Sequence, residues 1–148
     1  MVLGALGKGA AGLEPVLQQR LVALAEGFDQ PWDCASALWC FGAGVAGLAP
    51  ALQQRLVLLA EGLDLPRHRA SALWGLGKGV AGLAPALQQR LVLLAEGLDR
   101  PKHRAIVLKG LGEGVAALEP ELQWRLAALA DGLVQPEYRA RALAALLP

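Results

Sequence analysis

The chain has 148 residues, enough to bury the core of one ordinary domain, and its 14 basic and 13 acidic side chains nearly cancel. A net charge of +1 excludes a general electrostatic attraction to nucleic acid or to anionic membranes, so polyanion binding would need a local basic patch. Two cysteines, Cys34 and Cys40, are too few for a disulfide framework, and their spacing places them on different sides of a helix, which favours a reducing compartment.

A repeat of 35 residues runs through the chain. Residues 21–27 return with little change at 56–62, 91–97 and 126–132, and two series of prolines keep the same interval. The prolines are Pro15, Pro50, Pro85 and Pro120 in one series, and Pro31, Pro66, Pro101 and Pro136 in the other. We therefore expect one repeat domain over 1–148, with units at 1–30 (partial), 31–65, 66–100, 101–135 and 136–148 (partial).

Each complete unit predicts two helices, and the unit at 66–100 shows both. Proline suits the first position of a helix, because its missing N–H would be unpaired there, so this unit predicts helix A over 66–83 and helix B over 85–98. Apolar side chains then recur at helical spacing along one face of each helix. They are Leu73, Leu76, Val80 and Leu83 in helix A, and Leu87, Leu91, Leu94 and Leu98 in helix B.

No segment alternates with the period of a strand, so we expect an all-α fold without a sheet. A single helix pair cannot cover both of its apolar faces, so neighbouring pairs must stack and share one continuous core. The repeat therefore predicts a right-handed α-solenoid of about four helix pairs, with about nine helices in all.

Glycines are unusually frequent in helix A. Gly75, Gly79 and Gly82 share one flank of the predicted helix and Gly77 lies on the other, where small residues let neighbouring helix backbones approach closely. Each glycine costs about 1 kcal/mol of helix propensity, which packing must offset. The alternative is that 75–79 forms a turn and helix A is shorter.

Two other patterns in these segments have structural explanations. The G-x-G-x-x-G pattern of dinucleotide sites occurs at 7–12, 42–47 and 77–82, but it recurs in each unit without a preceding strand, which favours packing glycines. The uncharged run at 34–52 is long enough for a membrane span. Because the equivalent segments carry Lys78, Lys109 and Glu113, we expect a packed helix and no membrane partner.

The sequence shows no pattern of a catalytic or metal site. His68 and His103 share one repeat position, yet Asp33 and Tyr138 occupy it in other units, and a zinc site needs three or four convergent ligands. A recurring acid near the end of helix B is expected to make a structural contact between helix pairs; its members are Glu26, Glu61, Glu96 and Asp131. We expect no catalytic residue, no metal and no cofactor, and a protein that is not an enzyme.

The units differ mainly at four positions of helix A, spaced i, i+4, i+7 and i+11. This spacing forms one stripe, roughly opposite the leucine face. The candidate partner-binding residues on this stripe are Trp32, Ser36, Trp39, Arg67, Ser71, Trp74, Lys78, Lys102, Lys109 and Glu113. The stripe also includes Ile106, and in the last unit Glu137, Arg141 and Ala144.

Two interpretations of the stripe remain open. Its residues are solvent-exposed and free to vary, or they line a face that selects a partner, as extended solenoid surfaces do. Trp39 and Trp74 favour the second, because two exposed tryptophans one repeat apart would form an aromatic ladder beside Arg67, Lys78 and Lys109, and Trp and Arg are enriched in binding hot spots. Alternatively, both tryptophans pack half-buried against the neighbouring helix A.

We expect a scaffold module that binds a protein or peptide. The alternative partner is RNA or DNA, with Trp faces stacking on bases and basic side chains holding phosphates. Glu113 and Glu137 interrupt the basic character of the stripe, and the chain lacks the cationic excess of a nucleic-acid-binding domain.

The chain resembles the broad class of α-solenoids, including HEAT and armadillo repeats. Its Ser-Ala-Leu-Trp segments at 36–39 and 71–74 resemble octotricopeptide-type repeats of organellar RNA-binding proteins and, in related forms, of bacterial effectors. The Leu-x-Pro segments at 48–50 and 83–85 are similar to TAL effector repeats. These resemblances imply a helical-repeat fold, and no family's binding residues carry over.

The chain begins and ends within predicted A helices, and the last helix has few polar residues to cover its apolar face. We expect a fragment of a longer array, or self-association into a homo-oligomer by end-to-end stacking. The first residues lack the order of a signal peptide, so we expect a cytoplasmic protein, with an exported effector as the alternative.

Overall fold

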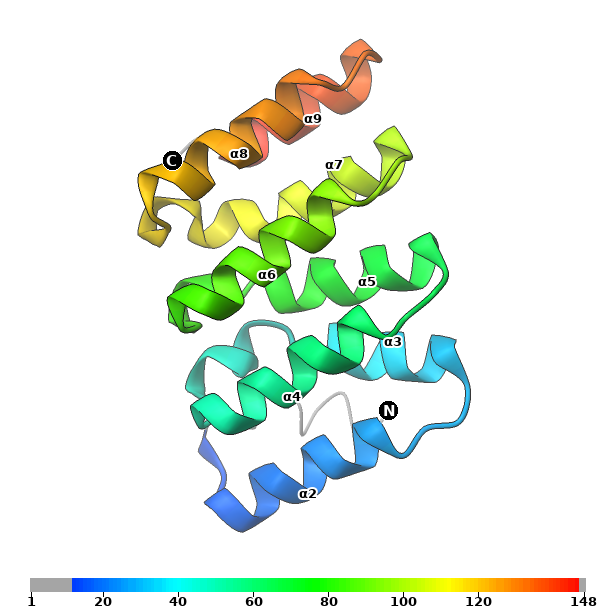
Figure 1. Ribbon diagram of the computed structural model, residues 1–148, viewed down its shortest axis with the longest axis vertical. Coiled ribbons are helices and arrows are strands. Elements are labelled where there is room, and N and C mark those ends of the chain that lie inside the picture. The colour runs from blue at the N-terminus through cyan, green and yellow to red at the C-terminus, as the bar shows by residue number, and fades with distance from the viewer. Residues whose placement is uncertain (1–11, 147–148) are drawn as a thin grey trace.

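The computed structural model describes residues 12–146, which fold into two layers of helices (Figure 1). The α-helices are α2 (Pro15–Glu26), α3 (Pro31–Phe41), α4 (Pro50–Glu61), α5 (Pro66–Gly77), α6 (Pro85–Glu96), α7 (Pro101–Leu111), α8 (Pro120–Asp131) and α9 (Pro136–Leu146). Short 3₁₀ helices follow three of them: η2 (Gly42–Gly47), η3 (Val80–Gly82) and η4 (Gly112–Ala117). The described residues contain no strand, which confirms the predicted all-α class. The helix A expected in unit 1–30 falls on residues 1–11, outside the described part.

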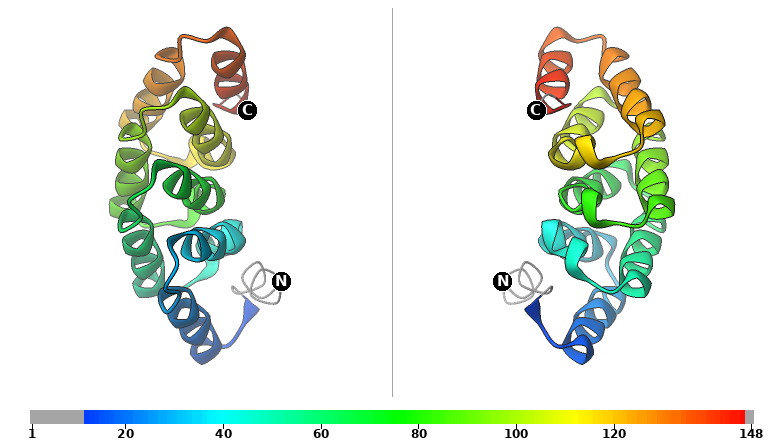
Figure 2. Two further views of the ribbon diagram at one scale, coloured as in Figure 1. Left: turned by 90° about the vertical axis from the view of Figure 1, so that its right-hand side faces the viewer. Right: turned by 90° about the vertical axis from the view of Figure 1, so that its left-hand side faces the viewer.

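The helix pairs stack along an arch, as the repeat predicts (Figure 2). Helices α3, α5, α7 and α9 form the A layer on the concave side, and helices α2, α4, α6 and α8 form the B layer on the convex side. Buried leucines, valines and alanines from both layers form one continuous core between them. None of the helices in 12–146 is long and apolar enough to cross a membrane.

Proline begins each helix pair where the sequence places it. The helices α2 to α8 carry Pro at their first turn, where no backbone N–H needs an intrahelical partner. Helix B of the unit at 66–100 ends at Glu96, close to the predicted boundary. The B helices end at glycines whose N–H groups donate to the last carbonyls of the helix.

The prediction that helix A runs over 66–83 is wrong in its second half. Helix α5 ends at Gly77, a turn follows, and η3 then leads the chain to the proline that begins α6. The uncharged run at 34–52 is likewise not one helix, since it spans α3, η2 and the start of α4. The physical reason is the glycine content of this segment, because several residues of low helix propensity follow one another. The alternative prediction, a shorter helix A followed by a turn, agrees better with the structure.

A buried glutamine in α4 and in α6 holds the 3₁₀ segment that precedes the helix. The Gln53 side-chain amide donates hydrogen bonds to the carbonyl oxygens of Val45 at 3.0 Å, Ala46 at 3.3 Å and Gly82 at 3.3 Å. Gln88 makes the corresponding bond to Val80 at 3.0 Å. These bonds give the carbonyl groups of the 3₁₀ segments an additional donor, and the bond from Gln53 to Gly82 joins two successive units.

Glycines bring the A helices into backbone contact, as their spacing predicted. A Cβ atom on Gly75 would lie 2.3 Å from the Cα of Trp39, and one on Gly110 would lie 2.4 Å from the carbonyl oxygen of Trp74. A Cβ on Gly77, on the opposite flank, would lie 3.0 Å from the backbone nitrogen of Leu111. Both flanks of α5 therefore touch a neighbouring helix. Because the A helices approach so closely, the arch curves toward them.

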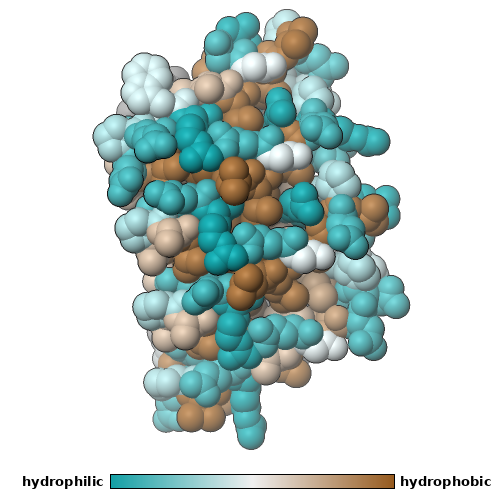
Figure 3. All heavy atoms as spheres, in the orientation of Figure 1, coloured by the Kyte–Doolittle hydropathy of each residue, from teal (hydrophilic) through white to brown (hydrophobic). Residues whose placement is uncertain are grey.

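The B layer is joined by ion pairs on its exposed surface. Arg55 donates to Glu26, and the same pair recurs as Arg90 with Glu61 and as Arg125 with Glu96. The Nε–Oε2 distances are 3.0, 2.9 and 3.0 Å. The expected contact between helix pairs is thereby confirmed for these acids, whereas Asp131 pairs with Arg139 of α9. Figure 3 shows this convex face, with hydrophobic side chains along its middle between hydrophilic ones.

Candidate binding face on the concave side

The concave face consists of the side chains that the A layer turns away from the core. All ten candidate residues of the stripe lie at least partly exposed on this layer. Trp32 is 59% exposed and Trp39 is 40% exposed, whereas Leu73 and Leu76 on the opposite side of α5 are fully buried. The stripe therefore lies opposite the core, as the helical spacing predicted, on the layer of helices that forms the concave side of the arch (Figure 2).

Four candidate residues form a ladder across α3, α5 and α7. The ring centroids of Trp39 and Trp74 lie 5.9 Å apart with the planes tilted by 55°. The ammonium nitrogen of Lys78 lies 6.0 Å from the Trp39 ring centroid and 5.4 Å from that of Trp74. Lys109 lies 6.0 Å from the Trp74 ring centroid on the next helix. These are distances at which a cation is attracted to an aromatic face. We call this set the Trp–Lys ladder.

Trp39 combines a close backbone contact with an accessible side chain. The backbone of Trp39 packs against Gly75 of the neighbouring helix, while its indole ring stays accessible. Arg67, which was expected beside the ladder, lies in the first turn of α5. Within residues 12–146 it makes no ring contact with either tryptophan. The structure therefore joins Lys78 and Lys109 to the tryptophans and leaves Arg67 apart from them.

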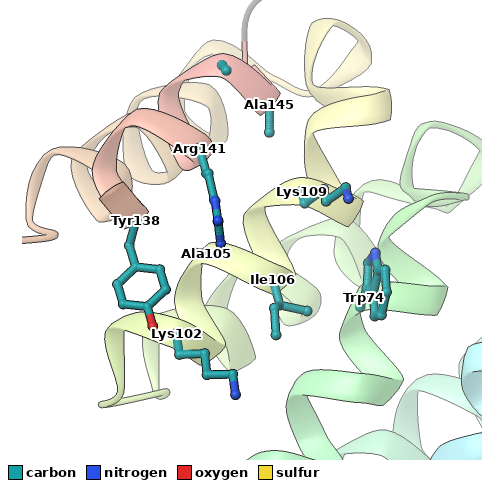
Figure 4. Close-up of a pocket in the computed structure, with 9 residues that line it drawn as sticks. Trp74, Lys102, Ala105, Ile106, Lys109, Tyr138, Arg141 and Ala145 are labelled. Carbon is teal, nitrogen blue, oxygen red and sulfur yellow. The ribbon is translucent and has the colours of Figure 1, made fainter. Parts of the chain in front are cut away.

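A groove of about 650 Å³ lies between α7 and α9 on the same face (Figure 4). We call it the α7–α9 groove. Its lining includes three candidate residues, Trp74, Lys102 and Lys109. Tyr138 and Arg141 extend into it from α9 (Figure 4). The charged side chains that line it all carry a positive charge.

Sequence reasoning did not choose Tyr138 or Arg141 as site residues. Arg141 belongs to the variable stripe, and Tyr138 stands where other units carry His68 and His103. The signal for Arg141 was therefore present in the comparison of the units. The groove itself exists because of the distance between α7 and α9, and the repeat pattern in the sequence does not predict that distance.

A smaller cleft of about 300 Å³ lies at the other end of the Trp–Lys ladder. Trp39, Ala43 and Lys78 line it together with Gly42 and Gly44. Gly42 has φ of 49°, a conformation that glycine adopts without a steric penalty, and it turns the chain from α3 into η2. The concave face thus carries an aromatic cleft near α3 and a basic groove near α9.

The two histidines sit beside this face without forming a metal site. The Nδ1 atoms of His68 and His103 are buried without a hydrogen-bond partner. Burial lowers the pKa of His103, and the charges of Arg100 and Lys102 lower it further, because each disfavours the charged imidazolium. Among the described residues, no group of three or more His, Cys, Asp or Glu side chains is placed to hold a metal ion.

The arrangement offers aromatic faces and ammonium or guanidinium groups on one continuous surface. Such groups contact apolar and anionic parts of a ligand side by side. Comparison with protein-family models, with curated proteins and with solved structures finds no match to this chain.

Proposed function

We propose that this chain is a binding module without catalytic activity, and that its concave face takes an extended segment of a protein partner. The observation that carries this proposal is the Trp–Lys ladder, which continues from α3 to α7 across three successive units. Aromatic side chains held on rigid helices supply contact area at little cost in conformational entropy. Extended concave surfaces of this kind are what stacked helical repeats use for binding.

The ladder is positioned by the scaffold before a partner arrives. Backbone contacts fix α3, α5 and α7 relative to one another, so the tryptophans need no ordering on binding. Preorganisation of this kind raises affinity because less entropy is lost on association.

The test selects peptides from a random display library on the wild-type protein and on two variants. Trp39→Ala/Trp74→Ala removes the aromatic faces of the ladder, and we expect it to lose the selected peptides. Trp124→Ala is the matched control, because Trp124 is 77% exposed on α8 of the B layer. Equal retention by all three proteins, at unchanged helicity, would contradict the proposal.

Single-stranded nucleic acid is a second candidate partner, favoured by the alternation of Trp rings and Lys ammonium groups in the ladder. It is less favoured because Glu113 and Glu137 are exposed on the same layer. An oligonucleotide that binds with a steep salt dependence, and that is lost by the double Trp variant, would establish this alternative.

Self-association through the terminal helices is a separate proposal. Leu143 of α9 is 41% exposed, although Leu38, Leu73 and Leu108 at the same repeat position are buried. Covering this residue with a second copy would bury apolar area. Sedimentation tests the proposal: a mass that rises with concentration supports it, and a concentration-independent monomer contradicts it.

A further inference from the structure

The concave face is not uniform along its length, and the difference concerns charge. Near α3 and α5 its large side chains are Trp39 and Trp74, with Lys78 between them. Near α7 and α9 the α7–α9 groove gathers three cations, Lys102, Lys109 and Arg141. Among residues 12–146, no acidic side chain lines this groove, although Glu113 and Glu137 are exposed elsewhere on the same layer. The face therefore has an aromatic pair between α3 and α5 and a cluster of three cations in the groove between α7 and α9.

The cations of the groove are available to a ligand. Within residues 12–146, the ion-pair partner of Arg141 is Glu137, at 2.8 Å, and the two side chains are 68% and 69% exposed. An exposed pair between residues one helical turn apart contributes little, so a ligand carboxylate can replace Glu137 without a large penalty. Lys102 is exposed and lies across the groove from Tyr138 and Arg141 (Figure 4).

The walls between these cations are apolar. Trp74, Tyr138, Ile106 and alanines line the groove beside the charged groups. A ligand that covers these walls excludes water from the groove, and the hydrogen bonds between its carboxylate and the guanidinium or ammonium groups are then stronger, because the local dielectric constant falls. The groove therefore suits a side chain that carries a negative charge next to carbon-rich groups.

We propose that the α7–α9 groove binds the acidic residues of the extended peptide partner, while an apolar residue of the same peptide lies against Trp39 and Trp74. This inference rests on the proposed function, and it adds the chemical class of the partner: an acidic peptide with an apolar anchor. The charge complementarity of the groove selects this occupant. A nucleic acid is disfavoured because Glu113 and Glu137 are exposed on the same layer, where they would repel its phosphates.

The test uses two labelled peptides of equal length. One has two leucines, a short Ser spacer and three glutamates, and the other has glutamine in place of each glutamate. Fluorescence anisotropy with the full chain measures both affinities. We expect the Glu peptide to bind about tenfold more tightly than the Gln peptide, because charge-assisted hydrogen bonds form only with the carboxylates. The preference is expected to shrink as salt is added.

The variant Lys102→Gln/Arg141→Gln then removes two of the three groove cations and keeps Lys109, which also belongs to the ladder. We expect this variant to lose most of the preference for the Glu peptide, with an affinity close to that of the wild type for the Gln peptide. The control Arg20→Gln/Arg55→Gln removes the same charge from the B helices α2 and α4, and we expect it to keep the tenfold preference. Circular dichroism confirms that each variant retains its helicity.

The outcomes separate this inference from the proposed function. If the wild type binds both peptides equally, the groove does not select acidic residues, and this inference alone is overturned. The same holds if the preference survives in Lys102→Gln/Arg141→Gln. If the wild type binds neither this pair nor any library peptide, the proposed function fails as well.

Discussion

The A layer and the B layer are joined by contacts of different kinds. In the A layer, Gly75 and Gly110 rest on the backbone of the preceding helix, with no room for a further carbon atom. In the B layer, arginines reach across an exposed surface to acids of the preceding helix. Backbone contacts cannot lengthen without separating the helices, whereas long side chains adjust. The A layer therefore fixes the curvature of the arch, and the B layer tolerates change.

The largest loss of stability is expected for Gly75→Ala, which changes a glycine of the A layer. Its Cβ would lie 2.3 Å from the Cα of Trp39, so α3 and α5 must move apart. We expect the free energy of unfolding to fall by about 2–3 kcal/mol despite the gain in helix propensity, because overpacking shifts the backbone. Chemical denaturation measures the change.

Gly62→Ala is the matched control for this substitution. Gly62 follows α4 in the B layer, and its nearest neighbour for a Cβ is the Leu59 carbonyl oxygen at 3.5 Å, an ordinary contact. We expect a change below about 0.5 kcal/mol, as at most exposed sites. Equal losses in the two variants would show that the A layer is not the tighter of the two.

The link between the layers is tested with Gln53→Leu. This substitution keeps the apolar bulk but removes the donor of three hydrogen bonds, to the carbonyl oxygens of Val45, Ala46 and Gly82. We expect a loss of about 1–3 kcal/mol, because each hydrogen bond contributes a fraction of this and all three are lost together. The exposed neighbour Gln54, changed to Leu, serves as control, and an equal effect there would contradict the role of the buried amide.

The B layer is tested with a double-mutant cycle on Glu96 and Arg125. Each side chain of this pair is 30% exposed, so solvent screens the attraction. We expect a coupling energy of about 0.2–1 kcal/mol that decreases with added salt. A coupling as large as the Gly75→Ala effect would mean that the ion pairs hold the array as firmly as the glycines do.

The smallest effect concerns pH. The hydrogen bond from Arg55 lowers the pKa of Glu26, and the nearby positive charge adds to it. A carboxyl whose pKa is lower in the folded chain stabilises the fold above its unfolded-state pKa, and this stability is lost as the pH falls through the folded-state pKa. We expect Glu26→Gln to be less stable than the wild type at neutral pH and equally stable in acid below that folded-state pKa. If the difference in stability between Glu26→Gln and the wild type persisted unchanged in acid, this mechanism would be contradicted. Asp64→Asn, at an exposed site, is the control.

The fold was largely predictable from the sequence, because the signals that set it are local and repeated. Proline at the first turn and leucines at helical spacing fix where each helix begins and which side is buried. The end of helix A was not predictable from apolar spacing, since Val80 and Leu83 fit a helical face and yet lie in or beside η3. Gln53, Gln88 and Gln123 recur at one position, but spacing alone does not show that a polar residue is buried.

For the candidate site too, some features were predictable from the sequence and others were not. The position of the stripe opposite the core followed from residue spacing, and so did the approach of Lys78 and Lys109 to the tryptophans. The position of the A layer on the concave side did not follow from residue spacing. It depends on neighbouring A helices lying closer together than neighbouring B helices. That difference arises from backbone contacts at Gly75 and Gly110.

In the A layer, main-chain atoms hold neighbouring helices together, whereas side chains form the concave surface. Gly75 and Gly110 touch main-chain atoms of Trp39 and Trp74, so the stack does not depend on which side chain those positions carry. The equivalent positions later in the chain hold Lys109 and Ala144. The side chain at this position can therefore vary from unit to unit, and with it the recognition surface, while the glycine contact beneath Trp39 and Trp74 stays the same.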